Sequence, residues 1–208
     1  MADDRPTSRK LDAEEGTLVI RSFCGPDDIL ALDFDGSFTR FAQYAPIISN
    51  KQSLAKKARD PDANVVLALS PDRTIIGFAV LAYPDPDERW VRVGERTMME
   101  VMVIEVSRPW RGCGLAKALL EMLIDHPLAE DRIIYMVGYS WTWDLEGMPA
   151  IQYREMMIRL FSHFGFQVFQ TNEPNVMMHP ENLFMARIGE NISEATVRRF
   201  KMVRFNMD

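Results

Sequence analysis

The segment RPWRGCGLAK, residues 108–117, places cations and glycines directly before an apolar run with helical spacing. These positions are Arg108, Arg111, Lys117, Gly112 and Gly114. Glycine permits positive φ, and the first N–H groups of a helix, at the positive end of its dipole, bind anions such as phosphate. The segment lacks the GK[ST] ending of a P-loop and the third glycine of a dinucleotide-binding loop. It predicts an anion site, with an ordinary glycine turn as the alternative.

Two carboxylates, Glu100 and Glu105, interrupt the apolar run 97–107. The run is apolar on both faces, as expected of a central strand, and an unpaired charge there is costly. Because the two positions are five residues apart, their side chains point to opposite faces of a strand. Three roles are therefore open to each carboxylate: it forms a structural ion pair, it lies at an exposed edge of the sheet, or it acts as a base in catalysis.

The segment YSWTWDLEGM, residues 139–148, holds two tryptophans beside acidic residues. Trp141 and Trp143 are two residues apart, and Asp144 follows them, a pattern that buries one ring and leaves the other free to be exposed. Exposed aromatic and acidic side chains suit a groove that receives a lysine of a peptide. The alternative is that both tryptophans plug the end of a sheet.

Apolar periodicity places these residues among strands and helices. Strands are expected at residues 17–23, 64–70, 75–83, 97–107, 132–139, 166–170 and 182–189. Helices are expected after Gly25, within 34–59, after Gly114, at 151–164 and at 193–205. The pattern predicts one mixed α+β domain over 17–190, a flexible tail over 1–16, and a C-terminal helix over 191–208 that packs on the domain.

The composition of the 208-residue chain excludes several classes of protein. It is 47% apolar with a formal net charge of −6, so it lacks the basic face of a general nucleic-acid binder. Two cysteines are too few for a disulfide framework, and no Cys/His spacing suggests a metal site. No apolar run approaches the ~18 residues of a membrane span, and the polar N-terminus does not look like a signal peptide. We therefore expect a cytoplasmic protein with no membrane or nucleic-acid partner.

Residues 111–116, RGCGLA, resemble the acyl-CoA pyrophosphate loop of the GCN5-related N-acetyltransferase (GNAT) superfamily. The order hairpin, long strand, loop, helix, strand, helix ending in FGF, and strand is similar to that family from about residue 17 to 190. The resemblance implies a GNAT fold, a mixed central sheet of about six to seven strands with helices on both faces. It also implies acetyl-CoA as co-substrate and no metal.

Further segments are similar to the acetoin-utilisation branch of that superfamily, from roughly residue 64 onward. They are YPDPDERW, IEVSRPWRGCG, WTWDL, YREMM and HPENLFMARIG. Members of that branch are protein lysine acetyltransferases that modify, and so switch off, acetyl-CoA synthetase. The resemblance implies a lysine of that synthetase as the acceptor and leaves the oligomeric state open.

The family assigns roles to particular positions of this chain. The implied cofactor-binding residues of the loop are Arg111, Gly112, Cys113, Gly114, Leu115, Ala116 and Lys117. The strand before the loop pairs with the pantetheine arm through backbone groups, here those of Ile104 and Val106. Glu100 matches the general-base glutamate of the histone-acetyltransferase branch, and Glu105 is the second candidate. A base is useful because a lysine amine, with a pKa of about 10.4, is mostly protonated at neutral pH.

One position departs from the family pattern. The tyrosine that often protonates the leaving thiolate is Phe161 here, four residues before Gly165. Tyr153, eight residues earlier on the same helical face, Tyr139, at the end of the preceding strand, and a solvent proton are the alternatives. Cys113 is expected to be a small loop residue, since the family transfers acyl groups directly.

The sequence thus predicts an acetyl-CoA-dependent N-acetyltransferase that acts by direct transfer on a protein lysine, with Trp141, Trp143 and Asp144 lining the acceptor groove. A small-molecule amine N-acetyltransferase is the first alternative, and a closed acidic pocket around Glu100 would favour it. A non-catalytic acyl-CoA-binding regulator is the second, because the usual tyrosine is missing at Phe161.

Overall fold

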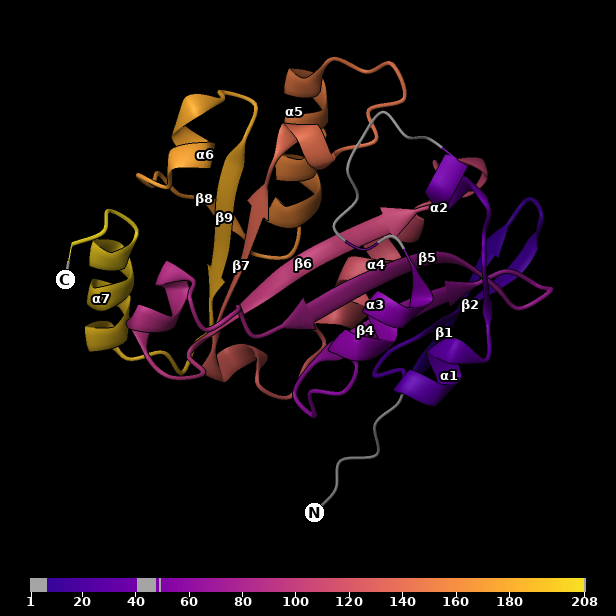
Figure 1. The fold of residues 1–208 in the computed structure, drawn as a ribbon, viewed down its shortest axis with the longest axis horizontal. Helices are drawn as coiled ribbons and strands as arrows, with labels where there is room; N and C mark the ends of the chain where they lie inside the picture. The colour runs from indigo at the N-terminus through magenta and orange to yellow at the C-terminus, as the bar shows by residue number, and fades with distance from the viewer. Residues whose placement is uncertain (1–6, 41–47, 49, 208) are drawn as a thin grey trace. The chain divides into compact units, whose positions relative to one another are not determined.

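The computed structural model describes residues 7–40, 48 and 50–207, which form two compact units. The first unit contains the described residues up to Ala82 together with Met102–His126. The second contains Tyr83–Val101 and the described residues from Pro127 onward. Strand β6 (Met98–Val106) crosses the boundary, and its first residues belong to the second unit (Figure 1).

The first unit holds five further strands beside the last part of β6. They are β1 (Ser8–Ala13), β2 (Gly16–Arg21), β3 (Asp33–Phe34), β4 (Asn64–Leu69) and β5 (Thr74–Ala82). The strand order is β1-β2-β4-β5-β6, and β3 pairs with β5 in parallel. The β1–β2, β2–β4 and β4–β5 pairs are antiparallel.

Strand β1 corrects the prediction of a flexible tail over residues 1–16. Ser8 pairs with Arg21, and Ala13 pairs with Gly16, whose φ is +124°. The side chains of β1 are polar and mostly exposed, as expected at the edge of a sheet. The apolar alternation that marks a half-buried strand is therefore missing from this part of the sequence. Residues 1–6 of the predicted tail lie outside the described residues.

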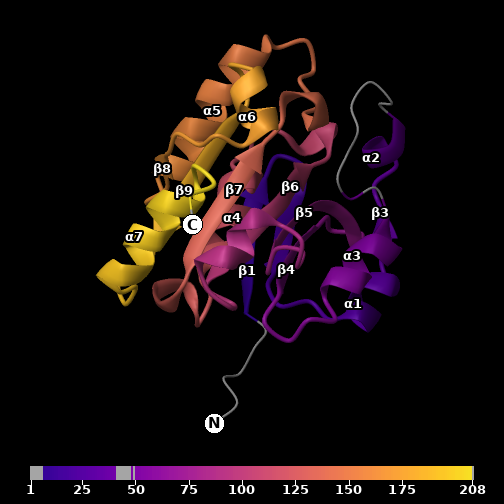
Figure 2. The same ribbon diagram turned by 60° about the vertical axis from the view of Figure 1, so that its left-hand side comes forward.

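Helices cover both faces of the β4–β5 pair. The helices of this unit are α1 (Pro26–Leu30), α2 (Ser37–Arg40), α3 (Lys51–Lys57) and α4 (Leu115–Ile124). A Cβ on Gly77 of β5 would touch the side chains of Leu119 and Leu115 at 3.1 and 3.4 Å, so α4 lies directly on this face. On the other face, Ile29 of α1 and Leu54 of α3 belong to the core cluster that contains Phe78 (Figures 1 and 2).

The second unit continues from the first residues of β6 in the order β6-β7-β9-β8. Its own strands are β7 (Ile133–Gly138), β8 (Gln167–Val168) and β9 (Leu183–Ile188). β6 and β7 are parallel, and the β7–β9 and β8–β9 pairs are antiparallel.

An aromatic core fills one face of the second sheet. The helices of this unit include η1 (Arg89–Val93), α5 (Ala150–Ser162), α6 (Pro174–Met178) and α7 (Glu194–Val203). Trp90 of η1 stacks on Phe184 of β9 with ring centroids 4.5 Å apart, and Tyr135 of β7 contacts both rings. Phe200 and Val203 bury the inner side of α7 in the same cluster.

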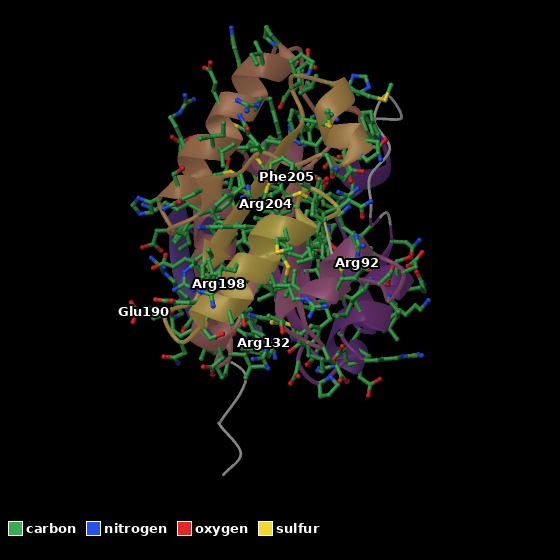
Figure 3. All side chains as sticks on the ribbon, turned by 90° about the vertical axis from the view of Figure 1, so that its left-hand side faces the viewer. Arg92, Arg132, Glu190, Arg198, Arg204 and Phe205 are labelled. Atoms are coloured by element: carbon green, nitrogen blue, oxygen red, sulfur yellow. The ribbon has the colours of Figure 1, made fainter. Side chains whose placement is uncertain are left out.

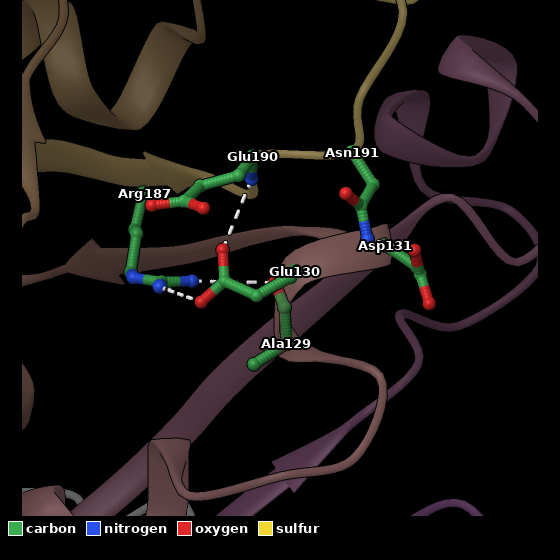
Figure 4. Close-up of polar contacts among 6 residues, drawn as sticks. All are labelled: Ala129, Glu130, Asp131, Arg187, Glu190 and Asn191. Atoms are coloured by element: carbon green, nitrogen blue, oxygen red, sulfur yellow. Dashed lines mark hydrogen bonds and ion pairs between the residues drawn. The ribbon is translucent and has the colours of Figure 1, made fainter.

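Polar contacts join the start of β7 to the end of β9 (Figure 4). The Glu130 carboxylate, in the 3₁₀ helix η3 (Ala129–Asp131), pairs with the Arg187 guanidinium and accepts a hydrogen bond from the Glu190 N–H at 3.0 Å. The Asn191 side chain donates to Asp131 at 2.8 Å. The hydrogen bond from the Glu190 N–H and, after it, the hydrogen bond and charge of Arg187 lower the pKa of the Glu130 carboxyl.

The described residues form nine strands, more than the six to seven predicted. The mixed α+β class is confirmed. The additional strands include β1 and the two-residue β3, and the strand expected at 166–170 is reduced to Gln167–Val168. Helix α6 was not predicted, because a five-residue helix gives too short a periodic signal.

Candidate active site

The predicted anion loop joins β6 to α4 within the first unit, and both of its glycines adopt left-handed conformations. The φ angles are +88° at Gly112 and +84° at Gly114. A Cβ at either position would meet no atom within 4 Å, so the backbone conformation and not crowding requires glycine. Gly114 is the N-cap of α4, and the amide groups that follow it are donors without partners inside the helix.

Side chains of the loop stabilise this conformation. Arg111 donates its Nε–H to the Val106 carbonyl at 3.1 Å, and the Cys113 thiol donates to the Trp110 carbonyl at 3.2 Å. The Leu115 side chain is buried, so only its N–H faces the loop, whereas Lys117 is exposed. Backbone donors, positive charge and open space above the glycines are what a pyrophosphate requires, and the loop residues therefore fit the phosphate end of an acyl-CoA.

The two sides of strand β6 differ in how deeply their side chains are buried. Val101 and Val103 are buried, while the alternate residues Glu100, Met102, Ile104 and Val106 are half-buried. In the part of the chain that the structure describes, the β6–β7 ladder extends only from Met98 to Glu100. The later residues of β6 have backbone groups outside that ladder, which suits the backbone pairing implied for Ile104 and Val106.

Glu100 lies beside a buried tyrosine in the second unit. It pairs with Tyr135 in the parallel ladder, so both side chains lie on one face of the sheet. The Tyr135 hydroxyl donates to Glu88 at 3.3 Å. Burial raises the pKa of Tyr135 well above its usual value, and the charges of Glu100 and Glu88 add to this effect. Burial also raises the pKa of Glu88.

Tyr139 belongs to the same electrostatic cluster. Burial raises its pKa to about 12, with further contributions from the negative charges of Glu173, Glu100 and Glu88. Its hydroxyl therefore keeps its proton throughout the neutral range. Sequence reasoning considered Tyr139 but missed Glu88, Tyr135 and Glu173, since no spacing links residues so far apart along the chain. The segment DPDERW around Glu88 is polar and therefore gave no signal that this carboxyl is partly buried.

The two tryptophans have different environments, and neither ring is fully buried. Trp141 is 45% exposed and stacks on Tyr139 with centroids 4.9 Å apart. Trp143 is half-buried and stacks on Tyr153 at 5.0 Å. The His179 ring meets the Trp141 ring edge at 5.5 Å. Trp143 and Tyr153 thus form one aromatic pair of the second unit, and Trp141 provides an exposed ring.

The remaining predicted residues are placed as follows. Glu105 is half-buried and shares its side of β6 with Val103, opposite to Glu100. Asp144 is 6% exposed, so its carboxylate is an interior group and not an exposed wall of a groove. Phe161 is fully buried and packs edge-on against Phe166 at 5.1 Å. It is a core residue and has no hydroxyl to donate.

No group of three or more His, Cys, Asp or Glu side chains in residues 7–40, 48 and 50–207 is arranged to hold a metal ion. Over the same residues, no helix is long and apolar enough to cross a membrane.

The sequence model of the acetyltransferase (GNAT) family matches residues 28–166. The chain therefore belongs to this family, whose members use acetyl-CoA as co-substrate, and is an N-acetyltransferase.

More similar relatives cover nearly the whole chain. The chain is 32% identical to the acetoin utilization protein AcuA of Bacillus subtilis (strain 168) over 200 residues, 95% of this chain and 93% of that protein. It superposes on the crystal structure of an acetoin utilization protein from Exiguobacterium sibiricum 255-15 with a TM-score of 0.87 and 28% identity, over 99% of this chain and 96% of that one. A phosphinothricin acetyltransferase from Sinorhizobium meliloti in complex with AcCoA shares the fold, with a TM-score of 0.52 and 19% identity, over 88% of this chain and 90% of that one.

Proposed function

We propose that this enzyme acetylates a lysine of a protein acceptor, with acetyl-CoA synthetase as that acceptor and Glu100 as general base. The position of Glu100 carries the proposal. It stands on the half-exposed face of β6, four and six residues before Ile104 and Val106, and next to Tyr135 in the ladder. Similarity to acetoin utilization proteins over almost the full chain supports the choice of acceptor.

The loop residues bind the co-substrate in this proposal. The N–H groups around Gly112 and Gly114 and the positive charge of Arg111 hold the pyrophosphate, and backbone groups of Ile104 and Val106 pair with the pantetheine arm. Acetyl-CoA supplies a thioester carbonyl for the amine to attack. Leu115 and Ala116 contribute backbone donors, and Lys117 adds charge at the solvent side.

Glu100 prepares the nucleophile. It accepts a proton from the lysine ammonium, directly or through a water, because only the neutral amine has a free electron pair. The amine nitrogen then forms the bond to the acetyl carbon as the carbon–sulfur bond breaks, and the second proton that the nitrogen loses passes to solvent. The CoA thiolate takes its proton from Tyr139 or from solvent. The Tyr139 hydroxyl carries a proton at neutral pH, and its raised pKa of about 12 makes it a weaker acid than an ordinary tyrosine.

The aromatic segment is the proposed acceptor-binding region. The exposed Trp141 ring offers a surface for a peptide chain, and the Trp143–Tyr153 pair stiffens the segment behind it. Asp144, as a buried residue, would act by fixing this segment and not by touching the acceptor.

A small amine is the second candidate acceptor, and one observation favours it. Three carboxylates, those of Glu88, Glu100 and Glu173, act on Tyr139 in the second unit. Such a concentration of negative charge attracts a small cationic amine as well as a lysine side chain.

One assay separates these candidates. The protein is incubated with labelled acetyl-CoA, purified acetyl-CoA synthetase and a panel of polyamines, amino acids and aminoglycosides, beside the Glu100→Gln variant. Label on the synthetase that disappears in the variant supports the proposal. Label on a small amine alone would identify a small amine, and not a protein lysine, as the acceptor. Acetyl-CoA binding without transfer to any of these acceptors would contradict the proposal.

A further inference from the structure

The second unit carries a concentration of positive charge in an otherwise acidic protein. Residues 89–96 and 194–207 together hold seven cationic and two acidic side chains, whereas the whole chain has a net charge of −6. We call the following residues the arginine face: Arg89 and Arg92 of η1, Arg198, Arg199 and Lys201 of α7, and Arg204, which directly follows α7. Figure 3 looks onto α7, with Arg198 on the helix, Arg204 at its C-terminal end and Arg92 beside it.

Hydrogen bonds hold η1 and α7 together as one surface. Arg199 donates its Nε–H to the Arg92 carbonyl at 2.6 Å, and Arg92 donates to the Asn206 side chain at 2.5 Å. Beneath them, Phe200 is fully buried with Trp90 in the core of the unit. The cations of both elements therefore form a fixed array and not two independent segments.

The guanidinium groups of Arg89 and Arg204 donate to neutral acceptors. Arg89 donates to the Asn172 amide oxygen at 2.6 Å, and Arg204 donates to the Gln170 carbonyl at 2.8 Å while lying over the Phe169 ring at 4.8 Å. Carbonyl and amide oxygens carry no formal charge, so these bonds fix the arginines without cancelling their charge. An ordered cluster of this kind presents a positive potential to a partner.

Exposed methionines accompany the cations. Met202 and Met207 are 43% and 52% exposed, and the Arg198 side chain is 68% exposed with only a solvent-facing pair to Glu194. Arginine and methionine are enriched in protein–protein interfaces, whereas lysine is depleted there. The mixture favours a folded protein over a nucleic acid, for which the net charge of −6 is also unfavourable.

We propose that the arginine face docks an acidic surface of the protein acceptor and so sets the enzyme's preference for that protein. This inference rests on the proposed function, because it requires that the acceptor be a protein. The charge of the face accelerates encounter and the methionines seal the contact, while the acetyl transfer itself depends on other residues. A protein with a negatively charged patch near its target lysine is the partner that fits.

The test compares two charge reversals of equal size. Arg198→Glu with Lys201→Glu changes two exposed residues of α7, and Lys56→Glu with Arg59→Glu is the matched control on exposed positions of the first unit. Both double variants alter the net charge equally. KM and kcat are measured with purified acetyl-CoA synthetase at low and high salt, together with the Kd of acetyl-CoA and the melting temperature.

We expect the α7 variant to raise KM for the synthetase about tenfold at low salt and to lose its salt dependence. kcat, acetyl-CoA binding and melting temperature should stay unchanged, and the control should alter KM less than about twofold. Equal effects of the two variants would overturn the docking face while leaving the proposed function standing. Absence of labelling of the synthetase by the wild type would overturn both.

Two further outcomes would assign the face to another partner. If light scattering shows a dimer for the wild type and a monomer for the α7 variant, a second copy of the chain occupies the arginine face. Binding of duplex DNA or anionic vesicles by the wild type, lost in the α7 variant, would make the occupant a polyanion. Either result contradicts an acidic protein acceptor at this surface.

Discussion

The loop before α4, which we propose to bind the co-substrate, and the cluster around Glu100, which we propose to contain the base, are built from different parts of the chain. In the first unit, Gly112 and Gly114 shape the backbone, and the donors for an anion are main-chain N–H groups. In the second unit, Glu88, Glu100 and Tyr139 act through the charges and hydroxyl groups of side chains from separate segments.

This difference explains what each region tolerates. The loop depends on glycine at positions with open surroundings, so a side chain there strains the backbone and obstructs the ligand without disturbing a core. The cluster depends on burial, since burial is the main cause of the raised pKa values of Tyr135, Tyr139 and Glu88. We therefore expect loop variants to affect binding and cluster variants to affect the rate of transfer.

Gly114→Glu should give the largest effect. The added carboxylate occupies the anion site, and a non-glycine residue at positive φ costs about 1–3 kcal/mol of stability. We expect the Kd of acetyl-CoA to rise about 100-fold or more, measured by calorimetry. Gly147→Glu is the matched control, because Gly147 has a φ of +85° and equally open surroundings. A similar loss of affinity in both variants would move the pyrophosphate elsewhere.

Glu100→Gln should give the next largest effect, on kcat alone. Loss of a general base lowers kcat by about 100-fold or more. The control is Glu105→Gln, on the opposite side of β6, which should change kcat less than about threefold. The Kd of acetyl-CoA should match the wild type in both variants. If Glu105→Gln proved the more damaging change, Glu105 would be the base.

Tyr139→Phe compares the two candidate tyrosines. Removal of the hydroxyl should lower kcat about tenfold, a modest loss because solvent can also protonate the thiolate. Tyr153→Phe keeps the stacked ring on Trp143 and should change kcat much less. Since the pKa of Tyr139 is about 12, deprotonation of its hydroxyl should not limit the rate at neutral pH. The reverse ranking in a kcat comparison would make Tyr153 the acid.

Glu130→Gln should give the smallest effect, on stability and not on transfer. The pKa of Glu130 is lowered in the folded protein, so its ionised form stabilises the fold above the unfolded pKa of about 4.3. That contribution is lost as the pH falls through the lowered pKa. The melting temperatures of variant and wild type should differ near neutral pH and converge in acid. Glu194→Gln, in an exposed pair with Arg198, should show little difference at any pH.

The sequence predicted the backbone of the loop, a glycine turn between a strand and a helix, because these signals are local. The spacing of Gly112 and Gly114 after an apolar strand and before a helix specifies backbone conformation within a few residues. The same holds for the opposite orientation of Glu100 and Glu105, which follows from alternation in a strand. The membership of the GNAT family followed from the order of these elements.

The sequence did not predict the side-chain cluster or the edge strand. Glu88 and Tyr135 meet only because η1 packs on the sheet, and no local pattern encodes that packing. β1 is polar because it lies at an edge, so it has no apolar period to detect. Asp144 was expected in the acceptor groove, but burial of a carboxylate depends on neighbours that composition does not reveal.

We expect the loop to determine the affinity for acetyl-CoA and Glu100 to determine the rate of acetyl transfer. The most direct measurement is a single-turnover experiment in which Gly114→Glu and Glu100→Gln are each compared with wild type for acetyl-CoA affinity and for transfer to the synthetase. We predict that Gly114→Glu loses affinity but regains transfer at high acetyl-CoA, whereas Glu100→Gln binds normally and remains slow at saturation. Loss of affinity in Glu100→Gln, or normal transfer at saturation, would contradict the account.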